Sequence, residues 1–148
     1  MHRVGAVIGA VVFGCGLAAC GGGGSPAPTK PAFIAAADAR CKKVKDDAKA
    51  RPASKTLEER MQRLQASIDD NQALNAALRK MKTPKGDQAV IKTVLNDMDV
   101  VATDGQALIT ATRANDMKRV TAAVTALTKS QDAAKLAASG YGFKECGV

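Results

Sequence analysis

The chain has 148 residues and a formal net charge of +8, and 46% of its residues are hydrophobic. Aromatic residues make up only 3%, with no tryptophan and a single histidine, which disfavours base-stacking surfaces and histidine-dependent catalysis. The length fits one domain, and the abundance of Ala, Leu, Val, Lys, Asp and Gln favours helices that pack through small side chains.

Residues 1–19 have the order of a secretory signal peptide. His2 and Arg3 are followed by an apolar run from Val4 to Gly16 and then by small residues. The sequence Leu17-Ala18-Ala19-Cys20 resembles the lipobox of bacterial lipoproteins. The resemblance implies cleavage before Cys20, lipidation of its sulfur, acylation of the new N-terminus with a fatty acid such as palmitate, and a location on the extracytoplasmic side of the cell membrane. The alternative is a retained transmembrane anchor, for which the run is short.

Residues 20–31 predict a tether between the lipidated cysteine and the folded domain. Gly21–Gly24 and Ser25 favour a flexible chain, and the prolines that follow extend it, to roughly 30 Å from the bilayer. The predicted domain covers residues 32–148.

Two helices are predicted in the first half of this domain from apolar residues spaced three and four apart. The first runs from about Ala32 to Arg51 and ends before Pro52. The second begins at the capping box Thr56-Leu57-Glu58-Glu59 and ends at Thr83-Pro84. The residues expected to face inward are Ile34, Ala37, Cys41, Val44 and Ala48, then Leu57, Met61, Leu64, Ile68, Leu74, Leu78 and Met81.

Two further helices are predicted in the second half. The third starts at Asp87 as N-cap and fades between Thr112 and Asn115, and its Gly105 allows a close helix contact. The fourth starts after Asp116 and stops at Gly140. The expected inward residues are Ile91, Val94, Leu95, Met98, Val101, Leu108 and Ile109, then Met117, Val120, Val124, Leu127, Ala134 and Ala138.

Long helices joined by short loops predict an all-α fold, an antiparallel four-helix up-down bundle. Cys15 leaves with the signal peptide and Cys20 takes the lipid, so Cys41 and Cys146 remain to form a disulfide in an oxidising compartment. The tail after Gly140 then folds back and packs Tyr141 and Phe143 over the end of the bundle. Two separate buried thiols are the alternative.

The domain also resembles a group of uncharacterised secreted or lipid-anchored helical proteins of actinobacteria. The residues that carry this resemblance are Ala37-Asp38-Ala39-Arg40-Cys41, Asn115-Asp116, and Tyr141-Gly142-Phe143-Lys144-Glu145-Cys146-Gly147. The resemblance implies a disulfide-closed helical domain, and it implies no activity.

Catalytic patterns are scarce, and we predict that the protein is not an enzyme and needs no cofactor or metal. Cleavage before Cys20 removes His2, the one histidine of the chain, and with it any Ser-His or Cys-His pair. Asp69 and Asp70 are neighbours that point about 100° apart on a helix. An enzyme that uses carboxylates alone is the remaining alternative.

Basic residues are concentrated in and just after the first predicted helix. The candidate contacts for an anionic surface are Arg40, Lys42, Lys43, Lys45, Lys49 and Arg51. Anionic lipid, a wall polymer or an acidic envelope protein would fit such a face. The alternative is a solvated face whose charges pair between helices. Binding of nucleic acid is not expected outside the cell.

Two asparagines fall where the second helix faces inward, Asn71 and Asn75. They either line a small ligand site between helices or satisfy each other and set the helix register. The sequence therefore predicts a membrane-anchored lipoprotein that binds a partner protein or an anionic envelope component. The alternative is a carrier of a small or lipidic ligand in an interior cavity of at least about 300 Å³.

Overall fold

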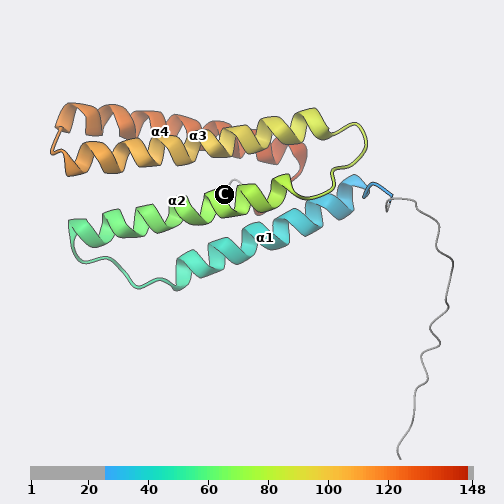
Figure 1. The fold of residues 1–148 in the computed structure, drawn as a ribbon, viewed down its shortest axis with the longest axis horizontal. Coiled ribbons are helices and arrows are strands. Elements are labelled where there is room, and N and C mark those ends of the chain that lie inside the picture. Colours follow the sequence, from blue (N-terminus) through green and yellow to red (C-terminus); the bar gives the residue numbers. More distant parts are fainter. Residues whose placement is uncertain (1–25, 147–148) are drawn as a thin grey trace, which may run out of the picture.

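The protein is an all-α, up-down bundle of four helices, as predicted (Figure 1). The computed structural model describes residues 26–146, so the predicted signal peptide and Cys20 lie outside the described residues. The helices are α1 (Lys30–Ala50), α2 (Leu57–Arg79), α3 (Gln88–Arg113) and α4 (Met117–Tyr141). Within residues 26–146, no helix is both long and apolar enough to cross a membrane.

The first two helices begin at side-chain caps. The Thr29 hydroxyl accepts a hydrogen bond from the Ala32 N–H (3.4 Å), and Pro31 lies in the first turn, where a missing N–H costs nothing. α1 therefore starts two residues before the predicted Ala32. The predicted capping box of α2 is confirmed, because Thr56 and Glu59 each accept from the other's backbone N–H at 3.1 Å.

Two helix ends differ from the prediction. α2 ends at Arg79 instead of near Thr83. α4 passes through the predicted stop at Gly140 and ends at Tyr141, so that prediction was wrong. At the end of α4, the residue with a left-handed backbone conformation is Gly142, with φ of 111°. Its N–H donates to the carbonyls of Ala138 and Ser139. A turn at this position directs the tail toward α1.

The two ends of the bundle are packed differently. We call the end with the start of α1, the 80–87 connection and the end of α4 the proximal end, and the end with the 51–56 and 114–116 connections the distal end (Figure 1). Helices pack in chain order, α1 on α2, α2 on α3 and α3 on α4. Within the described residues, the Cα atoms of α1 and α4 do not approach within 8 Å of each other. The two helices meet through side chains at the proximal end, where Phe33 packs on Tyr141, and through the tail after α4.

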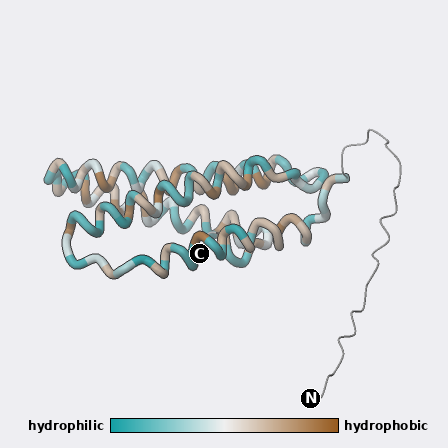
Figure 2. The backbone as a smooth tube through the Cα atoms, turned by 60° about the horizontal axis from the view of Figure 1, so that its bottom comes forward, coloured by the Kyte–Doolittle hydropathy of each residue, from teal (hydrophilic) through white to brown (hydrophobic). Residues whose placement is uncertain are grey.

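The larger core fills the proximal end, where hydrophobic positions alternate with hydrophilic ones along each helix (Figure 2). All four helices and the tail contribute to it. Its buried residues are Phe33, Ala37, Cys41, Leu74, Leu78, Ile91, Val94, Leu95, Met98, Ala138, Tyr141, Phe143 and Cys146. Phe33, which the predicted stripe of the first helix did not include, lies edge-on to Tyr141 with ring centroids 6.3 Å apart. Tyr141 and Phe143 close this end of the bundle, as the sequence predicts.

The smaller core lies in the distal half, mainly between α2 and α3. Its buried members are Ile68, Ala102 and Ile109, with Met61 and Leu64 packed against them. Gly105 allows the close approach that the sequence predicts, because a Cβ atom there would lie 3.1 Å from the Ile68 Cδ1. α1 takes no part in this cluster.

The buried stripe of α4 runs along the whole helix, through Ala123, Ser130, Ala134, Ala138 and Tyr141. In the distal half this stripe differs from the predicted inward face. Met117 is 67% exposed and Val124 is 47% exposed, because both lie beside the stripe and not on it. The predicted burial of these two residues, and of Leu57, was wrong.

The only tyrosine of the chain provides a test of the proximal core. Burial raises the pKa of Tyr141 above its ordinary value of 10, and the hydrogen bond from its phenol to Asp87 (2.7 Å) raises it further. The unfolded phenol ionises near pH 10 while the folded one keeps its proton, so we expect the free energy of unfolding to fall as the pH rises above about 10.

Denaturant unfolding between pH 8 and 11 measures this fall, and phenolate absorbance follows Tyr141 directly. Tyr141→Phe should lose stability at neutral pH but decline less steeply at high pH, because only lysine titration remains. Equal slopes for the two proteins would contradict the buried phenol.

Candidate functional site

The predicted disulfide is confirmed and joins the middle of α1 to the end of the tail. Cys41 and Cys146 have Cα atoms 5.1 Å apart, and both side chains are buried. They are 105 residues apart in the sequence, so the bond closes most of the domain into one loop. On the chain-entropy model, a loop of this length stabilises the folded state by about 4.7 kcal/mol.

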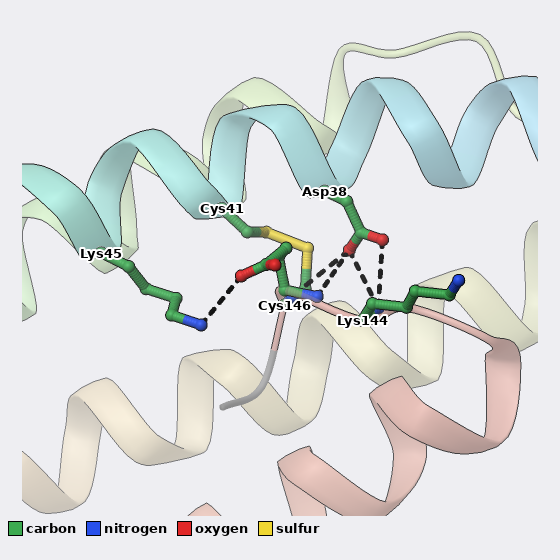
Figure 3. The surroundings of a disulfide bond; sticks show 6 residues. Asp38, Cys41, Lys45, Lys144 and Cys146 are labelled. Atoms are coloured by element: carbon green, nitrogen blue, oxygen red, sulfur yellow. Dashed lines mark hydrogen bonds and ion pairs between the residues drawn. A yellow bond between two sulfur atoms is a disulfide. The ribbon is translucent and has the colours of Figure 1, made fainter.

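A carboxylate that the sequence analysis gave no role lies beside this disulfide. Asp38 is three residues before Cys41, so both are on one face of α1. Its side chain accepts hydrogen bonds from the backbone N–H groups of Lys144 (3.0 Å), Glu145 (2.9 Å) and Cys146 (3.4 Å), as Figure 3 shows. Asp38 thus satisfies three donors of a segment that has no helix or sheet partner of its own.

A third contact holds the tail to α1. The Lys45 ammonium donates to the Glu145 carboxylate at 2.9 Å, one turn beyond Cys41 (Figure 3). The spacing of Asp38, Cys41 and Lys45 therefore places a hydrogen-bond acceptor, a covalent bond and a cation in one row along α1. We call these three contacts the tail latch.

The basic segment of α1 is largely occupied by partners within the domain. Lys42 pairs with Asp46 at 2.5 Å and Lys43 with Asp47 at 2.6 Å, each one helical turn apart. Lys45 pairs with Glu145, and Arg51 contacts both the Asp70 carboxylate and the Ser67 hydroxyl. These ion pairs favour the alternative of internal charge pairing for four of the six candidate residues.

The other two candidates differ from these four. Within residues 26–146, Arg40 and Lys49 are exposed and make no ion pair. The two cations are nine positions apart, about 14 Å along the helix axis. An anionic surface would thus find two separated charges on α1 instead of a continuous basic face.

The two inward asparagines have different surroundings. Asn75 is buried, and its amide donates to the Leu95 carbonyl (2.8 Å) and to the Asp99 carboxylate, which fixes the register of α2 against α3. Its Oδ1 has no partner among the described residues. Asn71 is half-buried and lines a cleft between α2, α3 and α4. Asn75 therefore has a packing role, whereas Asn71 lines the cleft and its amide donates to the Ser67 carbonyl at 2.8 Å.

This cleft has a volume of about 450 Å³. It is open to one side, and its lining combines apolar with polar and charged side chains. The lining residues are Asn71, Met98, Val101, Gln131, Asp132, Ala134 and Lys135.

A larger groove of about 710 Å³ crosses the distal half of α3 and α4. Its lining includes alanines at positions 102, 107, 111, 114, 122, 123 and 126, and Arg119 is the one charged residue that lines it. Charges are sparse throughout this half: residues 120–128 have none, and residues 100–112 have only Asp104. We call residues 117–128, with Met117 and Val124 exposed on one side and the groove on the other, the distal surface of α4.

Within residues 26–146, no group of three or more His, Cys, Asp or Glu side chains is placed to hold a metal ion. Neither the cleft nor the groove is lined by more than one carboxylate.

The chain matches no protein-family model, no curated protein sequence and no solved structure. Conclusions about its function therefore depend on the geometry described above.

The tail latch leads to a prediction about stability. Replacing Asp38 with Ala leaves three backbone donors without their acceptor, so we expect the free energy of unfolding to fall by about 1–3 kcal/mol with the disulfide intact. Denaturant unfolding under oxidising conditions measures the change. Asp46→Ala is the matched control, because Asp46 lies on the same helix and contacts only Lys42, in an exposed pair. A loss no larger than that of the control would contradict the role of Asp38.

Proposed function

We propose that the protein is a non-enzymatic lipoprotein, anchored to the extracytoplasmic side of the cell membrane through Cys20, that binds a partner protein with the distal surface of α4. The lipobox resemblance of residues 17–20 and the Gly- and Pro-rich sequence of residues 21–31 support the anchor. The observation that carries the binding role is the exposure of Met117 and Val124, two large apolar side chains beside the buried stripe of α4, in a half of the helix that has few charges.

The character of this surface favours a protein over an anionic polymer. The uncharged residues 120–128 provide apolar contact and hydroxyl groups but no cation, and depletion of charge is typical of the centre of protein interfaces. Lys118 and Lys129 border the stretch at its two ends, and neither has an ion-pair partner within residues 26–146. A partner with an apolar centre and acidic residues at its rim complements this pattern.

A small amphipathic ligand in the cleft at Asn71 is the second candidate. The cleft is larger than the 300 Å³ or so that a ligand site requires, and the Asn71 and Gln131 amides would fix the orientation of a polar group. Its open side and mixed lining fit a lipid tail less well. Bound ligand released from the purified protein on denaturation would favour this candidate over protein binding.

The anchor is tested by metabolic labelling with a fatty acid. We expect the label on the wild-type protein and none on Cys20→Ser, because the thiol is the attachment point. Cys41→Ser is the matched control, since it alters a cysteine of the domain and should retain the label. Label on Cys20→Ser would contradict the lipoprotein proposal.

The distal surface is tested by a photo-crosslinking residue placed in the lipidated protein in native membranes. We expect a discrete adduct from position 124, and from position 122 if the partner also fills the groove. Met117→Gln should lower the adduct yield about fivefold or more, as expected for a residue at the centre of an interface. Position 136 is the matched control, because Leu136 is 74% exposed on the same helix but outside the distal surface of α4.

Two results would contradict the proposal: no adduct from position 122 or 124, or the same adduct from position 136. A further variant, Arg40→Glu with Lys49→Glu, examines the basic segment of α1. Loss of the adduct in this variant would move the binding site to α1.

A further inference from the structure

Five exposed lysines lie at the proximal end. None of them is among the six residues that the sequence analysis named as contacts for an anionic surface. They come from three separate segments: Lys30 begins α1, Lys80, Lys82 and Lys85 lie in the connection between α2 and α3, and Lys144 lies in the tail. Within residues 26–146, none of the five takes part in an ion pair.

Tyr141 brings two of these segments together. The Lys30 ammonium lies 4.3 Å from the centroid of the Tyr141 ring. The phenol of Tyr141 donates to Asp87, the last residue of the connection that carries the other lysines. In Figure 3 the side chain of Lys144 extends along α1 toward the beginning of that helix. The five charges therefore belong to one end of the molecule.

The carboxylates at this end are already engaged. Asp87 accepts from the Tyr141 phenol, and Asp38 accepts from three N–H groups of the tail. Both are half-buried, whereas the five lysines are exposed. Three of the six cations of α1, Lys42, Lys43 and Lys45, have a carboxylate partner. The proximal end instead combines five exposed lysines from three segments of the chain, and no ion pair is formed by them within residues 26–146.

The point where the predicted tether joins the domain indicates which end of the domain would face the membrane. Lys30 is ten residues after Cys20, a length of chain that reaches at most about 35 Å. α3 has 26 residues and is itself about 39 Å long, so the distal end lies far beyond the proximal one. If Cys20 carries the lipid, the proximal end is the part of the domain that the anchor holds near the bilayer.

We infer that Lys30, Lys80, Lys82, Lys85 and Lys144 bind anionic lipid headgroups and orient the bundle with its distal surface away from the membrane. This inference rests on the proposed lipid anchor. Each lysine near an anionic surface strengthens association about fivefold. The lipid chains already keep the protein on the membrane, so the lysines determine which face of the domain touches it. The distal surface of α4 then remains accessible to a partner.

The test compares lysine reactivity in the lipidated protein on two kinds of vesicle, pure phosphatidylcholine and phosphatidylcholine mixed with phosphatidylglycerol. A water-soluble amine-reactive reagent labels exposed lysines, and mass spectrometry gives the rate at each position. We expect the five lysines to react about fivefold or more slowly on the anionic vesicles, while Lys118 and Lys129 are unchanged. At 1 M salt, where screening acts within about 3 Å, the protection should disappear.

Charge-reversed variants complete the test. Lys80→Glu with Lys82→Glu and Lys85→Glu should remove the protection at Lys30 and Lys144, whereas Lys118→Glu with Lys129→Glu should leave it intact. Equal rates on both vesicles, or equal protection at Lys118 and Lys129, would overturn the inference while leaving the anchor in place. A protein that does not associate with either vesicle would instead contradict the lipid anchor, and the orientation would fall with it.

Discussion

Attachment of the C-terminal tail to α1 determines the shape of this domain. Five residues after α4, from Gly142 to Cys146, cross from the end of α4 to α1 and place Phe143 in the proximal core. The Asp38 carboxylate satisfies the N–H groups of this segment, and the disulfide holds its end. The hydrogen bonds matter as much as the covalent bond, because a non-helical segment placed in a core would otherwise bury unpaired donors.

The same attachment explains why the two halves of the bundle differ. Where the tail is present, Phe143 fills the gap between helices and the core is complete. After Cys41, toward the distal end, α1 is held to α2 by polar contacts. The Arg63 side chain of α2 donates to the carbonyls of Ala48 and Pro52. In this half α4 still buries Ala123 and Ser130, while Met117 and Val124 beside them stay exposed. The exposed apolar side chains of α4 therefore lie at the end of the bundle where α1 does not contribute to the core.

The parts of the fold that depend on local patterns could be predicted from the sequence. The capping box at Thr56 and the spacing of apolar residues placed the helices. The expected cleavage of Cys15 and lipidation of Cys20 left Cys41 and Cys146 as the pair to join, and the structure joins them. The role of Asp38 was not predictable, because it joins residues more than a hundred positions apart. Exposure of Val124 was missed because the spacing of large apolar residues pointed to Val124, whereas the stripe that α4 buries in this half runs through the small residues Ala123 and Ser130. The stop at Gly140 failed because Gly142 is equally permissive and lies where the tail must turn.

The predicted basic face of α1 was also revised by the structure, because a run of lysines in a sequence does not show which of them form ion pairs with carboxylates. The densest run, on α1, is interleaved with Asp46 and Asp47 at the spacing that pairs charges on a helix. The lysines of the proximal end are scattered along the chain, and Tyr141 and the tail bring their segments together. An isolated exposed ion pair contributes little to stability, but it removes a cation from the field that an anionic surface meets. At the proximal end the Asp38 and Asp87 carboxylates accept from backbone and phenol groups, and within residues 26–146 no carboxylate forms an ion pair with the five exposed lysines there.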